Sequence, residues 1–202
     1  MSSRRRASLR GVNTYDLGPA ARSVADLLDA IDDTQLSGPT PCPDYSVGEL
    51  LAHVVGLTAA FRAAAEKDFG PATDTAPDTT KPVLEADWRT VLPRQLDEVA
   101  AAWRTPESRE GQTRAGAVDL PAEVAGQVAL NELVVHGWDL ARATGQPYAV
   151  DDASLQVSYG LLKMMNQGGQ TDIFGPAVAV PEGAPFIDRV IGSSGRSPEW
   201  RP

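Results

Sequence analysis

The sequence predicts an all-α protein in which four long helices form an antiparallel bundle, followed by an extra C-terminal helix and an irregular tail. Apolar side chains recur at intervals of three and four residues through five segments, which is the period of helices that bury one face. Connectors rich in proline and glycine separate these segments. One connector, at residues 68–83, is long, and bundles often contain such a connection.

The first two helices are expected at residues 17–31 and 46–66. The first carries an apolar stripe with helical spacing and ends before the proline-rich stretch 37–43. The second opens with a capping box, in which the Ser46 side chain accepts from a backbone amide and Glu49 reaches back to the cap. The second helix is therefore expected to start at Ser46.

The later helices follow from similar signals. A third helix at 84–103 contains Pro93, which predicts a kink or a boundary there. Residues 105–119 have an irregular pattern, with room for a short hairpin. A fourth helix opens near Pro121 and closes at Gly145, because proline favours the first turn and glycine the position after the last. Two further helices are expected at residues 152–166 and 184–191, before a tail with an exposed Trp200.

Length and composition indicate one folded domain, expected at residues 16–202. The chain has 202 residues, of which 42% are hydrophobic and 22% charged, and this is enough to bury a single core. The preceding segment, residues 1–15, holds four arginines and no acid in its first ten positions, and we expect it to be disordered. No apolar stretch follows the arginines, which argues against a secretory signal.

Charge and cysteine content restrict the partners and the compartment. The net charge is -9, and because the first ten residues are basic, the rest of the chain is more acidic still. Such a body repels nucleic acid phosphates and anionic membrane surfaces. The sequence contains no uninterrupted run of about 18 apolar residues, and it therefore predicts no membrane-spanning helix. The lone Cys42 cannot form an internal disulfide, which fits a reducing cytoplasm, and we expect it to be a small buried residue rather than a reactive thiol.

Each of the two histidines in the sequence follows a glutamate by four positions: Glu49 precedes His53, and Glu132 precedes His136. Four residues advance a helix by slightly more than one turn, so each pair projects from one helical face. Both histidines lie in strongly apolar stretches, where a polar group without a partner costs free energy. Catalytic zinc sites commonly use three such nitrogen and oxygen ligands and leave one position open. His53, Glu132 and His136 would make such a set.

Other interpretations of the two pairs stay open. Glu49 is a rival ligand that would make the site dinuclear, although its place in the capping box already explains it. Glutamate and histidine at this spacing also form ordinary structural contacts on helices. Zinc is the first choice of metal, but two nitrogens and one carboxylate also suit iron, nickel or manganese.

Asp139 follows His136 by three positions and lies on nearly the same helical face. It could therefore accept a hydrogen bond from the imidazole and orient it without binding the metal itself. A salt bridge to Arg142 or to the helix at 17–31 is an equal alternative. Trp138 projects elsewhere, and we expect it in the core.

Three segments of the chain resemble a known family. They are PCPDYSVGELLAH at residues 41–53, ELVVHGWDLARATG at 132–145 and GRSPEW at 195–200. On these residues the chain resembles the mycothiol-dependent maleylpyruvate isomerase metal-binding family of actinobacteria, within the DinB-like superfamily. The resemblance implies a DinB-type four-helix bundle that holds a divalent metal, commonly zinc. It implies His53, Glu132 and His136 as the ligands, which are the residues that the helical spacing favours.

The resemblance also implies a function. In enzymes of this family a metal activates a low-molecular-weight thiol, so we expect a mycothiol-dependent isomerase or S-transferase that acts on a small electrophile. Maleylpyruvate itself is not favoured as the substrate. The isomerase has an additional C-terminal domain, and the basic residues near the motifs of this chain are Arg62 and Arg142.

Two other functional hypotheses remain. One is a metal-binding bundle without catalysis, acting as a small-molecule binder, a stress-response accessory or a homodimeric scaffold. The other is a helical domain in which both pairs of glutamate and histidine are structural. Open coordination beside a cleft would favour the enzyme over the binder.

Overall fold

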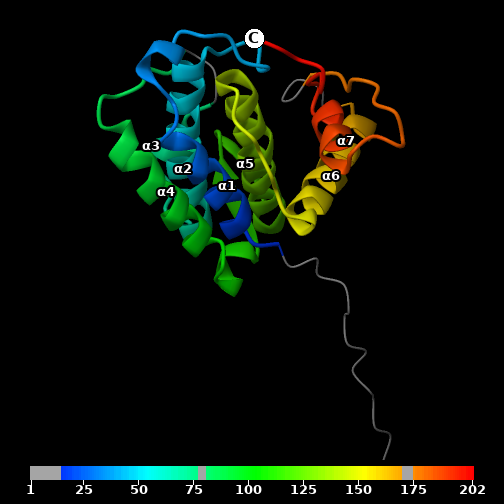
Figure 1. Ribbon diagram of the computed structural model, residues 1–202. Helices are drawn as coiled ribbons and strands as arrows, with labels where there is room; N and C mark the ends of the chain where they lie inside the picture. Colours follow the sequence, from blue (N-terminus) through cyan, green and yellow to red (C-terminus); the bar gives the residue numbers. More distant parts are fainter. Residues whose placement is uncertain (1–14, 77–80, 170–174) are drawn as a thin grey trace, which may run out of the picture.

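The computed structural model describes residues 15–76, 81–169 and 175–202 (Figure 1). Within these ranges the protein contains seven α-helices, two short 3₁₀ helices and a single two-stranded antiparallel sheet. The predicted helical fold class is therefore confirmed. The arginine-rich segment lies outside the described residues, except for Tyr15, which is buried and donates its hydroxyl to the Glu123 carbonyl.

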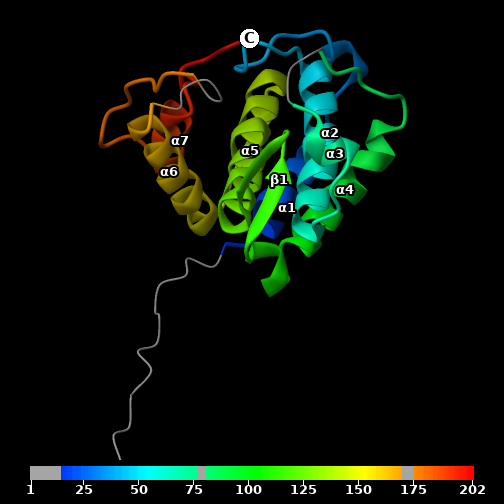
Figure 2. The same cartoon turned by 180° about the vertical axis from the view of Figure 1, so that it is seen from behind.

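Four long helices share the main core (Figures 1 and 2). They are α1 (Gly18–Leu28), α2 (Val47–Glu66), α4 (Trp88–Ala102) and α5 (Ala122–Thr144). Both α1 and α2 pack against α4 and against α5. Fully buried leucines from three of these helices meet in the core, among them Leu50, Leu92 and Leu130. Burial of one face of each helix is the main force that holds the bundle together.

The remaining helices and the hairpin surround this bundle. On the side of α5 away from α2, α6 (Asp152–Gln167) packs against α5 and α7 (Phe186–Ser193) packs against α6 (Figures 1 and 2). The strands β1 (Gln112–Ala115) and β2 (Val118–Pro121) form a hairpin that lies against α2 and α5. The smaller helices are α3 (Pro71–Asp74) and the 3₁₀ helices Asp33–Gln35 and Pro106–Arg109.

Local signals in the sequence predicted several helix ends correctly. The Ser46 amide donates to Glu49 Oε2 at 2.8 Å and the Glu49 amide donates back to Ser46 Oγ, so the capping box that begins α2 is confirmed. Gly145 ends α5 in the left-handed conformation at φ 70°. The short hairpin is also confirmed, with Gly116 and Ala117 in its turn, both at positive φ as hairpin turns of this size require.

Some predicted boundaries were wrong. α1 ends at Leu28 rather than at residue 31. The next residues form a tight turn, in which Ala30 and Ile31 donate to the Leu27 and Leu28 carbonyls, and Arg89 of α4 also donates to the Leu28 and Ile31 carbonyls. α4 begins at Trp88 rather than at 84, and Pro93 lies inside it rather than at a boundary.

Three further details differ from the prediction. The connector at 68–83 contains the short helix α3. Pro121 precedes α5 as its N-cap instead of occupying its first turn. Trp200 is half-buried rather than exposed, because its segment folds back onto the bundle through a hydrogen bond from Arg142 to the Pro198 carbonyl.

Within the described residues, α2 is the one helix long and apolar enough to cross a membrane. Charged and polar residues interrupt this stretch, so it contains no uninterrupted apolar run. Half of its most apolar window is buried inside the protein, and α2 packs against both α4 and α5. A helix in the centre of a protein core is as apolar as a helix that crosses a membrane.

Replacing Gly126 by alanine should destabilise the protein. A Cβ at this position would overlap the Tyr15 hydroxyl and would lie 2.7 Å from Cε3 of the fully buried Trp103. Overpacking of this kind costs about 1–3 kcal/mol. The control is Gly160→Ala on α6, where the added methyl would meet open space and should stabilise the helix by roughly 0.5–1 kcal/mol. Urea unfolding of both variants measures the two effects, and equal stabilities would contradict the prediction.

Candidate metal centre

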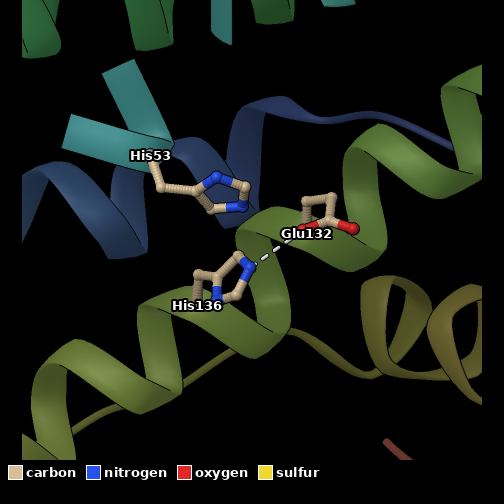
Figure 3. A group of neighbouring side chains, drawn as sticks. All are labelled: His53, Glu132 and His136. Carbon is tan, nitrogen blue, oxygen red and sulfur yellow. Dashed lines mark ion pairs between the residues drawn. The ribbon is translucent and has the colours of Figure 1, made fainter. Parts of the chain in front are cut away.

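Three metal-ligating side chains converge between α2 and α5 (Figure 3). His53 comes from α2, while Glu132 and His136 come from successive turns of α5. One donor atom from each of the three lies within 4.8 Å of the others. The spacing of four residues aligns the α5 pair on one face, and the packing of α2 against α5 brings His53 to it. The structure therefore assembles the three residues that the sequence singled out, and their role as ligands stays a prediction.

His136 uses its two ring nitrogens for different partners. Nε2 lies 3.0 Å from Glu132 Oε2, and Nδ1 lies 3.0 Å from Asp139 Oδ2. The His53 ring meets the His136 ring edge to face, with centroids 5.1 Å apart and planes at 89°. His136 thus turns one nitrogen toward the donor cluster and the other toward a carboxylate outside it, as metal-ligating histidines usually do.

Burial makes the cluster asymmetric. Glu132 and His136 are buried, whereas His53 is only half-buried. The Tyr45 ring lies beside His53, with centroids 4.9 Å apart. His53 is therefore the most exposed of the three candidate ligands.

The charges in the cluster shift the pKa values of its members. Burial alone would raise the pKa of the Glu132 carboxyl, but the hydrogen bond and the charge of His136 outweigh it and hold this pKa below its usual range. Burial would lower the pKa of His136, but hydrogen bonds to Asp139 and Glu132 outweigh it and raise the pKa to about 9. Without a metal, the positive charge at the centre of the cluster is therefore the His136 imidazolium.

The donor set fits a divalent metal. In zinc sites each nitrogen or oxygen ligand lies about 2.0–2.2 Å from the ion, so two ligands are no more than about 4.4 Å apart. The 3.0 Å between His136 Nε2 and Glu132 Oε2 lies within this limit, whereas the bound of 4.8 Å for the whole set lies above it, so the donors would have to draw closer to share one ion. Two imidazoles and one carboxylate suit zinc, and they also suit iron, nickel or manganese.

Glu49, the rival ligand, is not among the converging donors. Its carboxylate accepts from the Ser46 amide and pairs with Lys81, with Oε1 at 3.0 Å from Nζ. The capping box and this ion pair account for Glu49 without a metal. The described residues therefore give no support for a dinuclear site.

Asp139 has a partner that the sequence analysis did not identify. Besides His136, it contacts Arg196, whose Nη2 donates to Asp139 Oδ2 at 3.3 Å. Neither alternative partner predicted for Asp139 is used, since Arg142 instead donates to the Pro198 carbonyl and lies over the Trp138 ring. The signal that could have indicated Arg196 was its place in the third resembling segment, close to a short apolar helix.

Cys42 is buried close to this group, as the sequence predicted for a small structural residue. Burial raises the pKa of its thiol to about 11, and the positive charge of Arg196 offsets this only in part. The Cys42 thiol is therefore protonated at neutral pH. Cys42 is the only cysteine in the sequence, so the chain has no second thiol.

A narrow apolar cleft of about 10 Å³ adjoins Glu132 on the core side. Leu17, Val54, Phe61 and Val99 are among the residues that line it. This volume holds at most about one water molecule. The core side of the cluster is thus closed to larger molecules, and this cleft is not a substrate pocket.

The fold and the site define the protein as a helical, DinB-like chain with a partly buried cluster of two histidines and one glutamate. Comparison with known families supports this class. The family model described as the mycothiol maleylpyruvate isomerase N-terminal domain matches residues 17–141, more than half of the chain. The chain belongs to this family, as the resemblance in the sequence predicted.

Related sequences and solved structures agree with this assignment. Two uncharacterized proteins of Mycobacterium tuberculosis, one from strain H37Rv and one from strain CDC 1551, are each 28% identical over 132 residues, covering 65% of this chain and 67% of theirs. A crystal structure of the mycothiol-dependent maleylpyruvate isomerase has a TM-score of 0.54 at 15% identity, covering 76% of this chain and 70% of that one. A histidine-to-alanine mutant of that isomerase gives 0.54 at 14% identity, covering 80% and 71%. At these identities the solved structures establish a shared fold.

The metal-free protein should lose stability as the pH rises from about 6.5 to about 9. The pKa of His136 is raised on folding, so its contribution is complete below the unfolded value of 6.5 and disappears as the pH passes the folded value of about 9. Glu132 acts in the opposite sense, since its pKa is lowered and its contribution disappears as the pH falls through that value. Thermal unfolding in the presence of a chelator at pH 6 and pH 9.5 measures the alkaline loss, which His136→Gln should lack. A melting temperature of the parent protein that does not change across this range would contradict the assignment.

Proposed function

We propose that the protein binds a divalent metal, zinc by first choice, through His53, Glu132 and His136. We further propose that it uses mycothiol in an isomerase or S-transferase reaction on a small electrophile. The observation that carries the proposal is the convergence of these three side chains, in which His136 keeps its second nitrogen on Asp139. Convergence of three such donors around one point is the arrangement of a catalytic metal site with an open position.

The side chains divide the work in this proposal. Glu132 contributes a negative charge that offsets part of the charge of a cation, and Asp139 holds the His136 ring so that Nε2 faces the cluster. His53 lies on the half-buried side, where a thiol and an electrophile would arrive. A metal bound there lowers the pKa of a thiol or water at its open position toward neutrality.

Support for the thiol comes from the family. The matched family and the similar solved structures carry the name of a mycothiol-dependent isomerase. Cys42 remains protonated at neutral pH, so the chain itself offers no ready thiolate near the cluster within the described residues. A thiol cosubstrate from solution, in a reducing cytoplasm, would supply this group.

The proposed electrophile is small and carries little negative charge. Arg62 pairs with Glu66 and Glu98, and Arg142 donates to the Pro198 carbonyl, so both arginines near the motifs already have partners. Neither is placed to bind a substrate dicarboxylate without first leaving its partner. We therefore favour an electrophile other than maleylpyruvate, and we propose no nucleic acid or membrane partner for this acidic chain.

A second candidate function is metal binding without catalysis, either as a small-molecule binder, a stress-response accessory or a homodimeric scaffold. One observation favours it: Glu132 and His136, two of the three donors, are buried. A passive binder needs no room for two reactants beside the ion. Turnover with a thiol distinguishes this function from the enzyme.

Protein purified without a metal-affinity tag should contain about one divalent metal ion per chain, and His136→Ala should lose most of it. The reason is that His136 supplies one of the three converging donor atoms, and its contact with Asp139 orients the imidazole ring. Glu49→Gln is the matched control, because glutamine preserves the capping box and the rival ligand is removed. Elemental analysis checks both variants. Unchanged metal in His136→Ala, or loss of metal in Glu49→Gln, would overturn the ligand set.

The metal-loaded protein should consume mycothiol in the presence of a small Michael acceptor, and chelation should abolish the reaction. Re-addition of the metal should restore it, because the ion lowers the pKa of the bound thiol and so stabilises the thiolate at neutral pH. The rate of loss of free thiol measures this activity, with His136→Ala as the inactive control. An isomerase releases its thiol unchanged, so cis–trans conversion of an electrophilic alkene in the presence of mycothiol is measured as well. Metal binding with neither metal-dependent thiol consumption nor metal-dependent isomerisation would favour the passive binder.

A further inference from the structure

A buried series of contacting polar side chains extends from the candidate metal centre to the C-terminal segment. It runs from His136 through Asp139 to Arg196. We propose that Arg196 is a positioning residue for the metal centre, which it serves by holding the Asp139 carboxylate against His136. This inference rests on the proposed metal site and goes beyond it, because it makes metal affinity depend on a residue that touches no ligand.

The contacts within this series of side chains are short and shielded from water. His136 Nδ1 lies 3.0 Å from Asp139 Oδ2, and Arg196 Nη2 lies 3.3 Å from the same oxygen. Asp139 is 0% exposed and Arg196 7% exposed. Among the described residues, Asp139 Oδ1 and Arg196 Nε have no hydrogen-bond partner. Arg196 Nη1 also donates to the Ser194 carbonyl at 2.9 Å, so the guanidinium is held by its own segment and by Asp139, and Asp139 is held by Arg196 and His136.

The charge of Arg196 explains why Asp139 can stay in this position. A buried carboxylate is costly unless a cation accompanies it. When a metal occupies His136 Nε2, the imidazole is neutral and can only donate its Nδ1 proton. The guanidinium remains charged at every accessible pH, so Arg196 is the permanent cation beside Asp139.

The same contact determines which nitrogen of His136 faces the metal. An ionised carboxylate only accepts hydrogen bonds, so Asp139 requires the proton of a neutral His136 to reside on Nδ1. Nε2 is then free of a proton and turned toward Glu132 and His53. Partners of this kind commonly change metal affinity by 10–100-fold when they are removed.

The contact also links two distant parts of the sequence. Arg196 lies 57 residues after Asp139, just beyond α7. A second hydrogen bond, from Arg142 of α5 to the Pro198 carbonyl, ties the same segment to α5. Because coupling between two sites is reciprocal, docking of this segment and metal binding should favour each other. The segment is thus part of the metal centre in energetic terms, although it supplies no ligand.

The test compares metal affinity in Arg196→Gln and Arg142→Met by competition with a chromophoric chelator, using Zn²⁺ or Co²⁺. Arg196→Gln removes the charge beside Asp139 and should weaken binding at least tenfold, with partial recovery in Arg196→Lys. Arg142→Met releases the other tie of the same segment without touching Asp139, and it should stay within about threefold of the parent protein. Parent-like affinity in Arg196→Gln, or an equal loss in Arg142→Met, would refute the positioning role.

A double-mutant cycle separates the proposed route from general loosening. In an Asp139→Asn background, Arg196→Gln should cost less than threefold, because its effect passes through the carboxylate. Fully additive losses would mean that Arg196 acts by another route. Failure of the parent chain to bind Zn²⁺ or Co²⁺ would defeat the proposed function itself, whereas parent binding with no effect of Arg196 defeats this inference alone.

A measurement on the parent protein covers the case in which the Arg196 variants do not fold. Nitrogen-15 spectra of the zinc-loaded protein should show the His136 proton on Nδ1, in slow exchange with water, and the metal on Nε2. In Arg196→Lys, this proton should exchange faster as the carboxylate loosens. A metal-loaded parent with the metal on Nδ1 would contradict the proposed arrangement.

Discussion

The structure depends on one constraint: ionisable groups lie inside an apolar helical bundle and must find partners there. Glu132, His136 and Asp139 occupy one face of α5, where they are almost entirely removed from water. Isolated, each would carry a large desolvation cost. Together they place a potential cation between two carboxylates. The Arg196 guanidinium accompanies Asp139, and His136 lies between Asp139 and Glu132, so each buried carboxylate has a partner that can carry positive charge.

This constraint explains why the site was easier to predict than its surroundings. Glu132 and His136 are related by local helical spacing, and with only two histidines in the chain His53 was the natural third donor. Arg196 has no such relation to Asp139, because 57 residues separate them and no periodicity connects the tail with α5. Contacts of this range are set by how helices dock and not by any local pattern.

The fold divides in the same way. The start of α2, the end of α5 and the hairpin were predictable because residues within a few positions determine each of them. The end of α1 was not, because the residues after Leu28 turn tightly and receive contacts from elsewhere in the chain, among them the hydrogen bonds from Arg89 of α4. Trp200 was placed in solvent for a similar reason, since the hydrogen bond that holds its segment comes from α5.

The asymmetry of the cluster bears on how it could work. α5 carries two donors and Asp139 on one rigid helix, so their mutual geometry changes little. His53 comes from α2 and is half-buried, so its distance from the other two donors depends on how α2 packs against α5. The core side holds only a cleft of about 10 Å³. The more exposed side of the cluster is therefore the one that carries His53 and Tyr45, whose ring centroids lie 4.9 Å apart.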